Sequence, residues 1–237
     1  MGGGGRRGGA RGLAALGGAG VLLLLAPLVA RPAEAGRGRL AGKIALTHGG
    51  APKPDASGVI VYVVGFSEPP PTVIAEMAQK DKAFVPGLLA ITAGQSVSFP
   101  NRDPFFHNVF SLSPPRPFDL GQYTSKSAKV RAFPNPGVVE IYCNIHPEMA
   151  ATILVLPNRR FARTAADGSF AIEDVPAGAW SAFAFDPYAD KPARADVTVR
   201  AGEASEPPFA ALDETRAPEH LNKFGEKYKD AKGTYGR

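Results

Sequence analysis

The sequence has little of several residue types that functional sites use. It contains one cysteine, one tryptophan, three methionines and four histidines among 237 residues. A single cysteine excludes any disulfide within the chain. In an oxidising compartment, the thiol of Cys143 should therefore be either buried or bound to another group.

Strong net charge is also absent. Residues 1–35 contribute +3 of the formal net charge of +5, through four arginines and one glutamate. The remaining +2 gives no reason to predict nucleic acid as a partner. The same segment has an arginine-rich start, an apolar run at 13–30 and an Ala-Glu-Ala sequence at 33–35. This order predicts a secretory signal peptide, and hence a periplasmic or otherwise extracytoplasmic protein with no membrane span after cleavage. The alternative is a retained membrane anchor, because the apolar run approaches spanning length.

Turn-forming residues are abundant by contrast. The 27 glycines and 23 prolines predict many turns and short strands. Between them lie short β-branched and aromatic runs, and one segment at 72–82 that could form a short helical turn. An all-β protein made of sandwiches is therefore predicted, with strands at 44–47, 59–64, 88–91, 96–99, 124–133, 137–143 and 151–156.

Residues with metal-binding side chains cluster at the end of one predicted strand. Cys143 closes the strand at 137–143, and His146 and Met149 follow at intervals of three residues. A thiol at the inner end of a strand, followed by a tight loop, would direct all three side chains at one point. His107 follows the strand that ends at 99, and in a sandwich the two strand ends can be adjacent.

The donor set indicates the metal. A thiolate and two imidazoles with a weak thioether suit copper in both oxidation states. Zinc binds nitrogen, thiolate and carboxylate donors and seldom a thioether. Taken alone, each of these residues is more often a core or loop residue than a metal ligand. The four together, at these spacings, predict a site for one copper ion.

The pattern Cys-x-x-His-x-x-Met after a strand, with an upstream His-Asn pair, resembles the cupredoxins, the type 1 or blue copper proteins. The short loop between the ligands is most similar to that of amicyanin. The resemblance covers roughly residues 80–157. It implies a Greek-key β-sandwich and a mononuclear type 1 copper site with His107, Cys143, His146 and Met149 as ligands. It also implies that Asn108 forms a hydrogen bond across to the ligand loop.

Four segments are predicted along the chain. They are a signal peptide at 1–35, a cupredoxin domain at 36–157 to which residues 36–78 add strands, a small β-sandwich at 158–212, and a polar, lysine-rich tail at 213–237. In the small β-sandwich, the stretches at 167–172 and 175–180 are similar to the carboxypeptidase regulatory-like, transthyretin-like domains, which are structural or binding modules.

The tail allows two interpretations. Leu221, Phe224 and Tyr228 fall at helical spacing, which would permit a short docked helix, whereas its glycines favour a segment without order.

The resemblance implies a monomeric electron carrier that passes single electrons to redox proteins. His146 is the expected exit for the electron, within an apolar patch of Pro104, Phe105 and Pro147. An alternative function is a copper-binding, buffering or partner-docking module.

An enzyme such as a multicopper oxidase or a copper nitrite reductase would need a second copper centre built from many histidines. Only His48 and His220 remain, and both lie in polar segments where surface histidines are expected. The sequence therefore predicts a protein that is not an enzyme.

Overall fold

The computed structural model describes residues 1–2, 36–215 and 220–228. The predicted signal peptide lies outside the described residues. The described residues from 36 onward belong to one compact unit. Strands are the only regular secondary structure in the described ranges, which confirms the all-β prediction. None of the described residues forms a helix with the length and hydropathy needed to cross a membrane.

The first of two sandwiches has a sheet in the order β11-β10-β13-β14-β8 and a sheet in the order β12-β9-β5, with the hairpin β6-β7 beside them. The pairs β8-β14 and β5-β9 are parallel, and the other pairs are antiparallel. The strands are β5 (Ala75–Glu76), β6 (Ala78–Lys80), β7 (Ala83–Val85), β8 (Leu88–Thr92), β9 (Ser96–Pro100), β10 (His107–Ser111), β11 (Phe118–Tyr123), β12 (Ala128–Ala132), β13 (Gly137–Tyr142) and β14 (Ala150–Leu156).

Two local expectations are wrong here. The segment at 72–82 forms the short strands β5 and β6 instead of a helical turn. The strand expected at 124–133 begins only at Ala128, because residues 124–127 form the connection from β11 to β12.

Alternating side chains fill the core of this sandwich. Val97 and Phe99 on β9, and Val139 and Ile141 on β13, are fully buried, while their sequence neighbours lie at the surface or partly exposed. Burial of each such side chain stabilises the fold by about 1.5–3 kcal/mol. The same inward alternation continues from β13 to Cys143, which is also fully buried.

The second sandwich is built from both ends of the described chain. Its sheets have the orders β16-β1-β19, β15-β4-β17-β18 and β20-β2-β3. The strands are β1 (Arg37–Lys43), β2 (Leu46–His48), β3 (Ala51–Pro52), β4 (Ile60–Val64), β15 (Phe161–Arg163), β16 (Ser169–Pro176), β17 (Gly178–Phe185), β18 (Ala193–Val199), β19 (Ala204–Ser205) and β20 (Leu212–Glu214).

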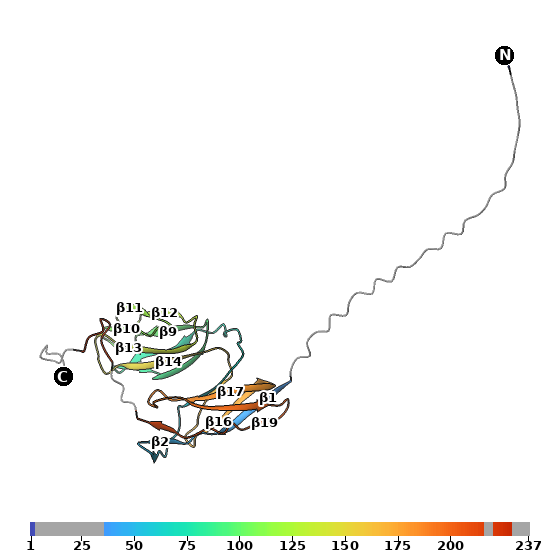
Figure 1. Ribbon diagram of the computed structural model, residues 1–237. Helices are drawn as coiled ribbons and strands as arrows, with labels where there is room; N and C mark the ends of the chain where they lie inside the picture. Colours follow the sequence, from blue (N-terminus) through green and yellow to red (C-terminus); the bar gives the residue numbers. More distant parts are fainter. Residues whose placement is uncertain (3–35, 216–219, 229–237) are drawn as a thin grey trace. The chain divides into compact units, whose positions relative to one another are not determined.

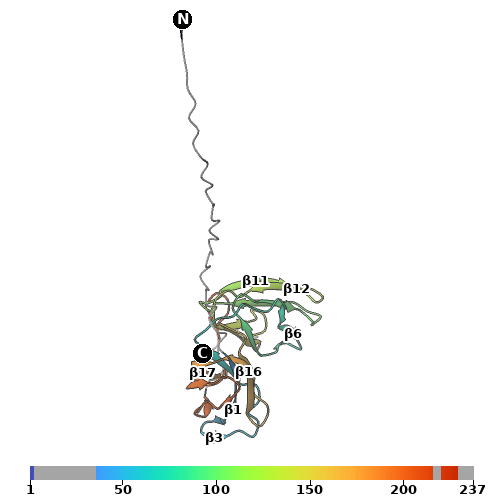
Figure 2. The same cartoon turned by 90° about the vertical axis from the view of Figure 1, so that its right-hand side faces the viewer.

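This pairing corrects the predicted domain organisation. Residues 36–78 were expected to extend the cupredoxin sandwich, but β1 pairs with β16, and β4 pairs with β15 and β17. In both views the blue strand β1 lies beside the orange strand β16 (Figure 1, Figure 2). The first sandwich is thus an insertion between β4 and β15. The apolar run of β4 finds its hydrogen-bonding partners about one hundred residues further along the chain, a separation that local sequence patterns do not reveal.

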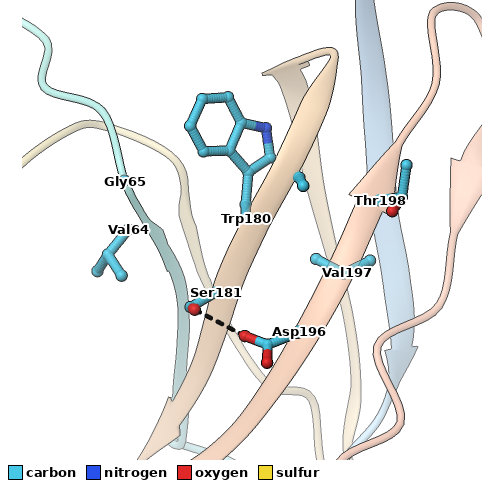
Figure 3. Close-up of a pocket in the computed structure, with 8 residues that line it drawn as sticks. Val64, Gly65, Trp180, Ser181, Asp196, Val197 and Thr198 are labelled. Carbon is cyan, nitrogen blue, oxygen red and sulfur yellow. Dashed lines mark hydrogen bonds between the residues drawn. The ribbon is translucent and has the colours of Figure 1, made fainter.

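The tryptophan of the second sandwich belongs to its packing. The indole of Trp180 packs against Phe66 and the buried cluster of this sandwich, and its nitrogen donates a hydrogen bond to Pro176 O (2.7 Å). Gly65 lies beside it in Figure 3, and a Cβ atom at this glycine would lie 2.7 Å from the indole. Gly65 also has φ of 120°, so a larger residue is excluded both by space and by backbone conformation.

A small apolar cluster joins the strands of the two sandwiches. Leu88, Leu154 and Leu156 of the larger sheet pack with Ile60 and Phe185. This contact explains why six consecutive residues of β14 are buried, because the strand is covered on both faces.

The described residues of the tail do not form the helix that the spacing allowed. Residues 220–228 are described as turns and irregular chain, and they contact the first sandwich.

We predict that a chain ending at Pro157 loses the second sandwich but keeps the first. Strands β1 and β4 would lose their partners, so amide protection at residues 37–64 should fall to that of an unfolded chain. The strands of the first sandwich, from β5 to β14, should keep slow exchange. Hydrogen exchange followed by mass spectrometry measures both segments. A chain ending at Thr215 is the control, and retained protection of 37–64 in the shorter chain would contradict this organisation.

Candidate metal centre

Three metal-binding side chains meet at one end of the first sandwich. His107 begins β10, Cys143 directly follows β13, and His146 lies in the loop to β14. Cys143 Sγ lies 4.0 Å from Nδ1 of each histidine, and the two Nδ1 atoms are 3.1 Å apart. Among the described residues this is the one group of three or more histidine, cysteine or acidic side chains close enough to share a metal ion.

These distances fit three donors around a single ion. Metal–nitrogen bonds of about 2.0–2.1 Å and a metal–sulfur bond of about 2.3 Å would place the donor atoms about 3–4 Å from one another. The geometry and the chemistry of the donor set therefore fit a thiophilic metal ion.

The four predicted ligand residues differ in how far they are buried. His107 and Cys143 are fully buried, and Met149 is 1% exposed, whereas His146 is partly exposed. Burial and the neighbouring His107 lower the pKa of His146. Its ring is therefore neutral at pH 7, which leaves a nitrogen lone pair available to a metal.

The loop from Cys143 to Met149, here called the ligand loop, is held by hydrogen bonds between its own residues. Met149 N donates to His146 O (3.0 Å), and Cys143 N donates to Met149 O (3.2 Å). The Ile145 N–H donates a hydrogen bond to Cys143 Sγ (3.4 Å), which fixes the position of the sulfur. Backbone bonds thereby join Met149 to Cys143 and His146, and its side chain lies in the same buried cluster as Cys143.

The sequence analysis missed the residue that orients His107. Asp103 Oδ2 accepts a hydrogen bond from His107 Nε2 (2.8 Å), which leaves Nδ1 directed at the thiol. Asp103 also accepts bonds from Asp81 N (2.7 Å) and Lys82 N (3.0 Å), in a turn where both residues have positive φ. Burial of Asp103 opposes ionisation, but the bonds from Lys82 N, His107 and Asp81 N outweigh it and lower the pKa of the carboxyl.

Such a carboxylate fixes the tautomer and the ring orientation of a metal-binding histidine. Asp103 lies in the polar loop four residues before His107. An acidic residue so close to a predicted metal ligand was the sequence feature that could have predicted this contact.

Asn108 does not make the contact that the resemblance implied. Its Nδ2 donates to Asp119 Oδ1 on β11 (2.7 Å). Its Oδ1 is buried and has no hydrogen-bond partner among the described residues. The expected bond across to the ligand loop is therefore absent, because Asp119 is the stronger, charged acceptor on the adjacent strand.

The remaining histidines lie outside the cluster. His48 is exposed and lies 3.8 Å from Glu214 Oε2 in the second sandwich. His220 is partly buried, and its Nε2 donates to Pro147 O in the ligand loop (2.6 Å). It contacts the backbone of the loop, a role that its place in a polar tail did not suggest.

No protein-family model and no curated protein sequence matches the chain. Several solved structures are similar to part of it. A copper-containing nitrite reductase from Thermus scotoductus is 24% identical, with 40% of this chain covering 25% of that one at a TM-score of 0.34. A purple cupredoxin from Nitrosopumilus maritimus is 22% identical, over 34% of this chain and 98% of that one, at a TM-score of 0.31. Amicyanin from Paracoccus versutus is 21% identical, over 40% and 97%, at a TM-score of 0.32. The matched part thus spans a quarter of the nitrite reductase and nearly all of the two smaller proteins.

Proposed function

We propose that the chain binds one copper ion through His107, Cys143, His146 and Met149 and carries single electrons with it. The observation that supports this most directly is the convergence of two imidazole Nδ1 atoms and one thiol within 4.8 Å of one another. When bound there, copper would cycle between Cu(I) and Cu(II). The type 1 character of the site is part of the proposal.

The chain's own residues favour a site that changes little between the two oxidation states. Asp103 holds the ring of His107, and the Ile145 N–H holds the sulfur of Cys143 in place. Full burial of His107 and Cys143 excludes water from one side of the donors. A rigid, preorganised donor set of this kind suits electron transfer, since little rearrangement is needed.

An apolar rim surrounds the one partly exposed donor. The rings of Phe105 and His146 lie 5.6 Å apart, and Phe105, Phe106 and Ile145 are 36%, 54% and 37% exposed. Pro104 and Pro147, expected in this patch, are also exposed. We place the docking surface for a redox protein here, because weak redox encounters need only a small contact area.

Copper buffering is the second candidate, because holding copper and passing electrons use the same donors. An exported, monomeric carrier without enzyme activity remains our preferred proposal. The similarity of the second sandwich to carboxypeptidase regulatory-like modules is likewise a proposal, and it would assign that sandwich a structural or binding role.

An absorption spectrum and a voltammogram of the copper-loaded protein test the proposal. We expect intense visible absorption and a reversible one-electron potential, and we expect Met149→Leu to keep the absorption while raising the potential, because the weak axial donor is lost. A colourless protein that binds only Cu(I) would favour buffering and contradict the carrier function.

A further inference from the structure

The C-terminal segment at 220–228, here called the C-terminal strap, lies across the outside of the ligand loop. The Tyr228 hydroxyl donates to Cys143 O (2.7 Å), and His220 Nε2 donates to Pro147 O (2.6 Å). Both acceptors are backbone carbonyls of the ligand loop. The strap thus binds the loop near each of its ends.

Lys223 forms a third connection. Its backbone N donates to Asn144 Oδ1 (3.0 Å), and its Nζ pairs with Asp119 Oδ2 (2.9 Å). Asp119 also accepts the hydrogen bond from Asn108, the residue next to His107. Through Asp119 and Asn108, the strap therefore links the loop that carries Cys143, His146 and Met149 to the strand that carries His107.

Aromatic packing supports these bonds. The His220 ring stacks on Tyr142 at 4.1 Å with an interplanar angle of 13°. The ring of Tyr228 contacts the His220 ring edge-on, at 5.2 Å and 80°. Tyr142 directly precedes Cys143, so the stack covers the chain at the point where it leaves β13 for the loop.

The loop needs such support because it has few backbone hydrogen bonds of its own. Its internal bonds join Cys143 to Met149 and His146 to Met149. Connections between strands open locally at lower free energy than the strands themselves. Groups that hold metal ligands from outside are what keep ligand geometry and metal affinity.

We propose that the C-terminal strap is a positioning element of the metal site, with Tyr228 and His220 as its positioning residues. It holds the ligand loop closed over Cys143 and so slows both opening of the site and exchange of the metal. The role in metal exchange rests on the proposed copper function. The role in closing the loop does not, since every contact above joins protein atoms only.

The first test uses the metal-free protein. Cys143 is fully buried, so a small alkylating reagent reaches its thiol only when the loop opens. The full chain is compared with a chain ending at Thr215 and with Tyr228→Phe. Tyr188→Phe is the matched control, because it removes a hydroxyl from an exposed tyrosine of the second sandwich.

We expect alkylation about two- to tenfold faster in Tyr228→Phe, the factor that one ordinary hydrogen bond represents. In the truncated chain, which loses all three bonds to the loop, we expect a rise of about tenfold or more. The thermal midpoint of Tyr228→Phe should stay close to that of the control. Equal alkylation rates in the full and truncated chains would overturn the inference, whether or not the protein binds copper.

The second test uses the copper-loaded protein. Transfer of copper to a chelator should accelerate in the same order, and the thiolate absorption bands of Tyr228→Phe should shift while those of Tyr188→Phe stay unchanged. Unchanged transfer rates and bands alongside faster alkylation would overturn the strap's role at the metal. Absence of any copper binding would instead contradict the proposed function, and the alkylation result would stand independently.

Discussion

Cys143→Ser is expected to abolish the intense visible absorption of the copper-loaded protein and to weaken copper binding by more than about 100-fold. Loss of a residue that only supports a ligand already costs 10- to 100-fold in metal affinity, so loss of the thiolate should cost more. The absorption depends on the thiolate, and a serine hydroxyl is a hard, largely protonated donor that copper binds poorly. A titration with copper followed by absorption and by a competing chelator measures both effects.

Met149→Leu is the matched control for Cys143→Ser, because it removes the other buried sulfur of the site and leaves the thiolate in place. Circular dichroism should show that both variants remain folded. If Cys143→Ser kept the visible band, the assignment of Cys143 as the thiolate donor would be wrong.

Asp103→Ala is expected to lower the free energy of unfolding by about 3 kcal/mol or more, even without metal. The carboxylate accepts bonds from Asp81 N, Lys82 N and His107 Nε2. Asp103 is 4% exposed, so water cannot readily replace it. Each buried donor left without an acceptor costs about 1–3 kcal/mol. Urea unfolding monitored by circular dichroism measures the change.

Asp190→Ala is the control for Asp103→Ala, since it removes an aspartate of the same charge from an exposed position. Asp103→Asn separates charge from packing. It should raise the reduction potential of the copper-loaded protein, because the negative charge beside His107 favours the oxidised state. If Asp103→Ala were as stable as the control, the three hydrogen bonds would not carry the role given to them.

Local sequence patterns predicted β8, β9, β13 and β14 of the first sandwich, and the reason is physical. Val97 and Phe99, and then Val139 and Ile141, alternate with period two, which is a property of the strand itself. The same alternation predicted that Cys143 would be buried. It could not predict the partner of a strand, and so residues 37–64 were assigned to the wrong sandwich.

The strap illustrates a second limit. Tyr228 and Cys143 are 85 residues apart, and the tail that carries Tyr228 is polar and rich in lysine. The spacing of its apolar residues allowed a helix, but the described residues form turns and irregular chain. Their conformation depends on hydrogen bonds to Cys143 and Pro147, which a propensity argument does not include.

The sequence by itself determined the all-β class and the spacing that puts Cys143, His146 and Met149 on one short loop, because both follow from contacts between near neighbours. Tertiary structure decided the rest. It brought His107 to within 4.0 Å of a thiol 36 residues away, and it placed Asp103 behind that histidine. These contacts depend on which strands pair and pack. Strand pairing is determined by the burial of apolar side chains throughout the core, which local sequence patterns do not describe.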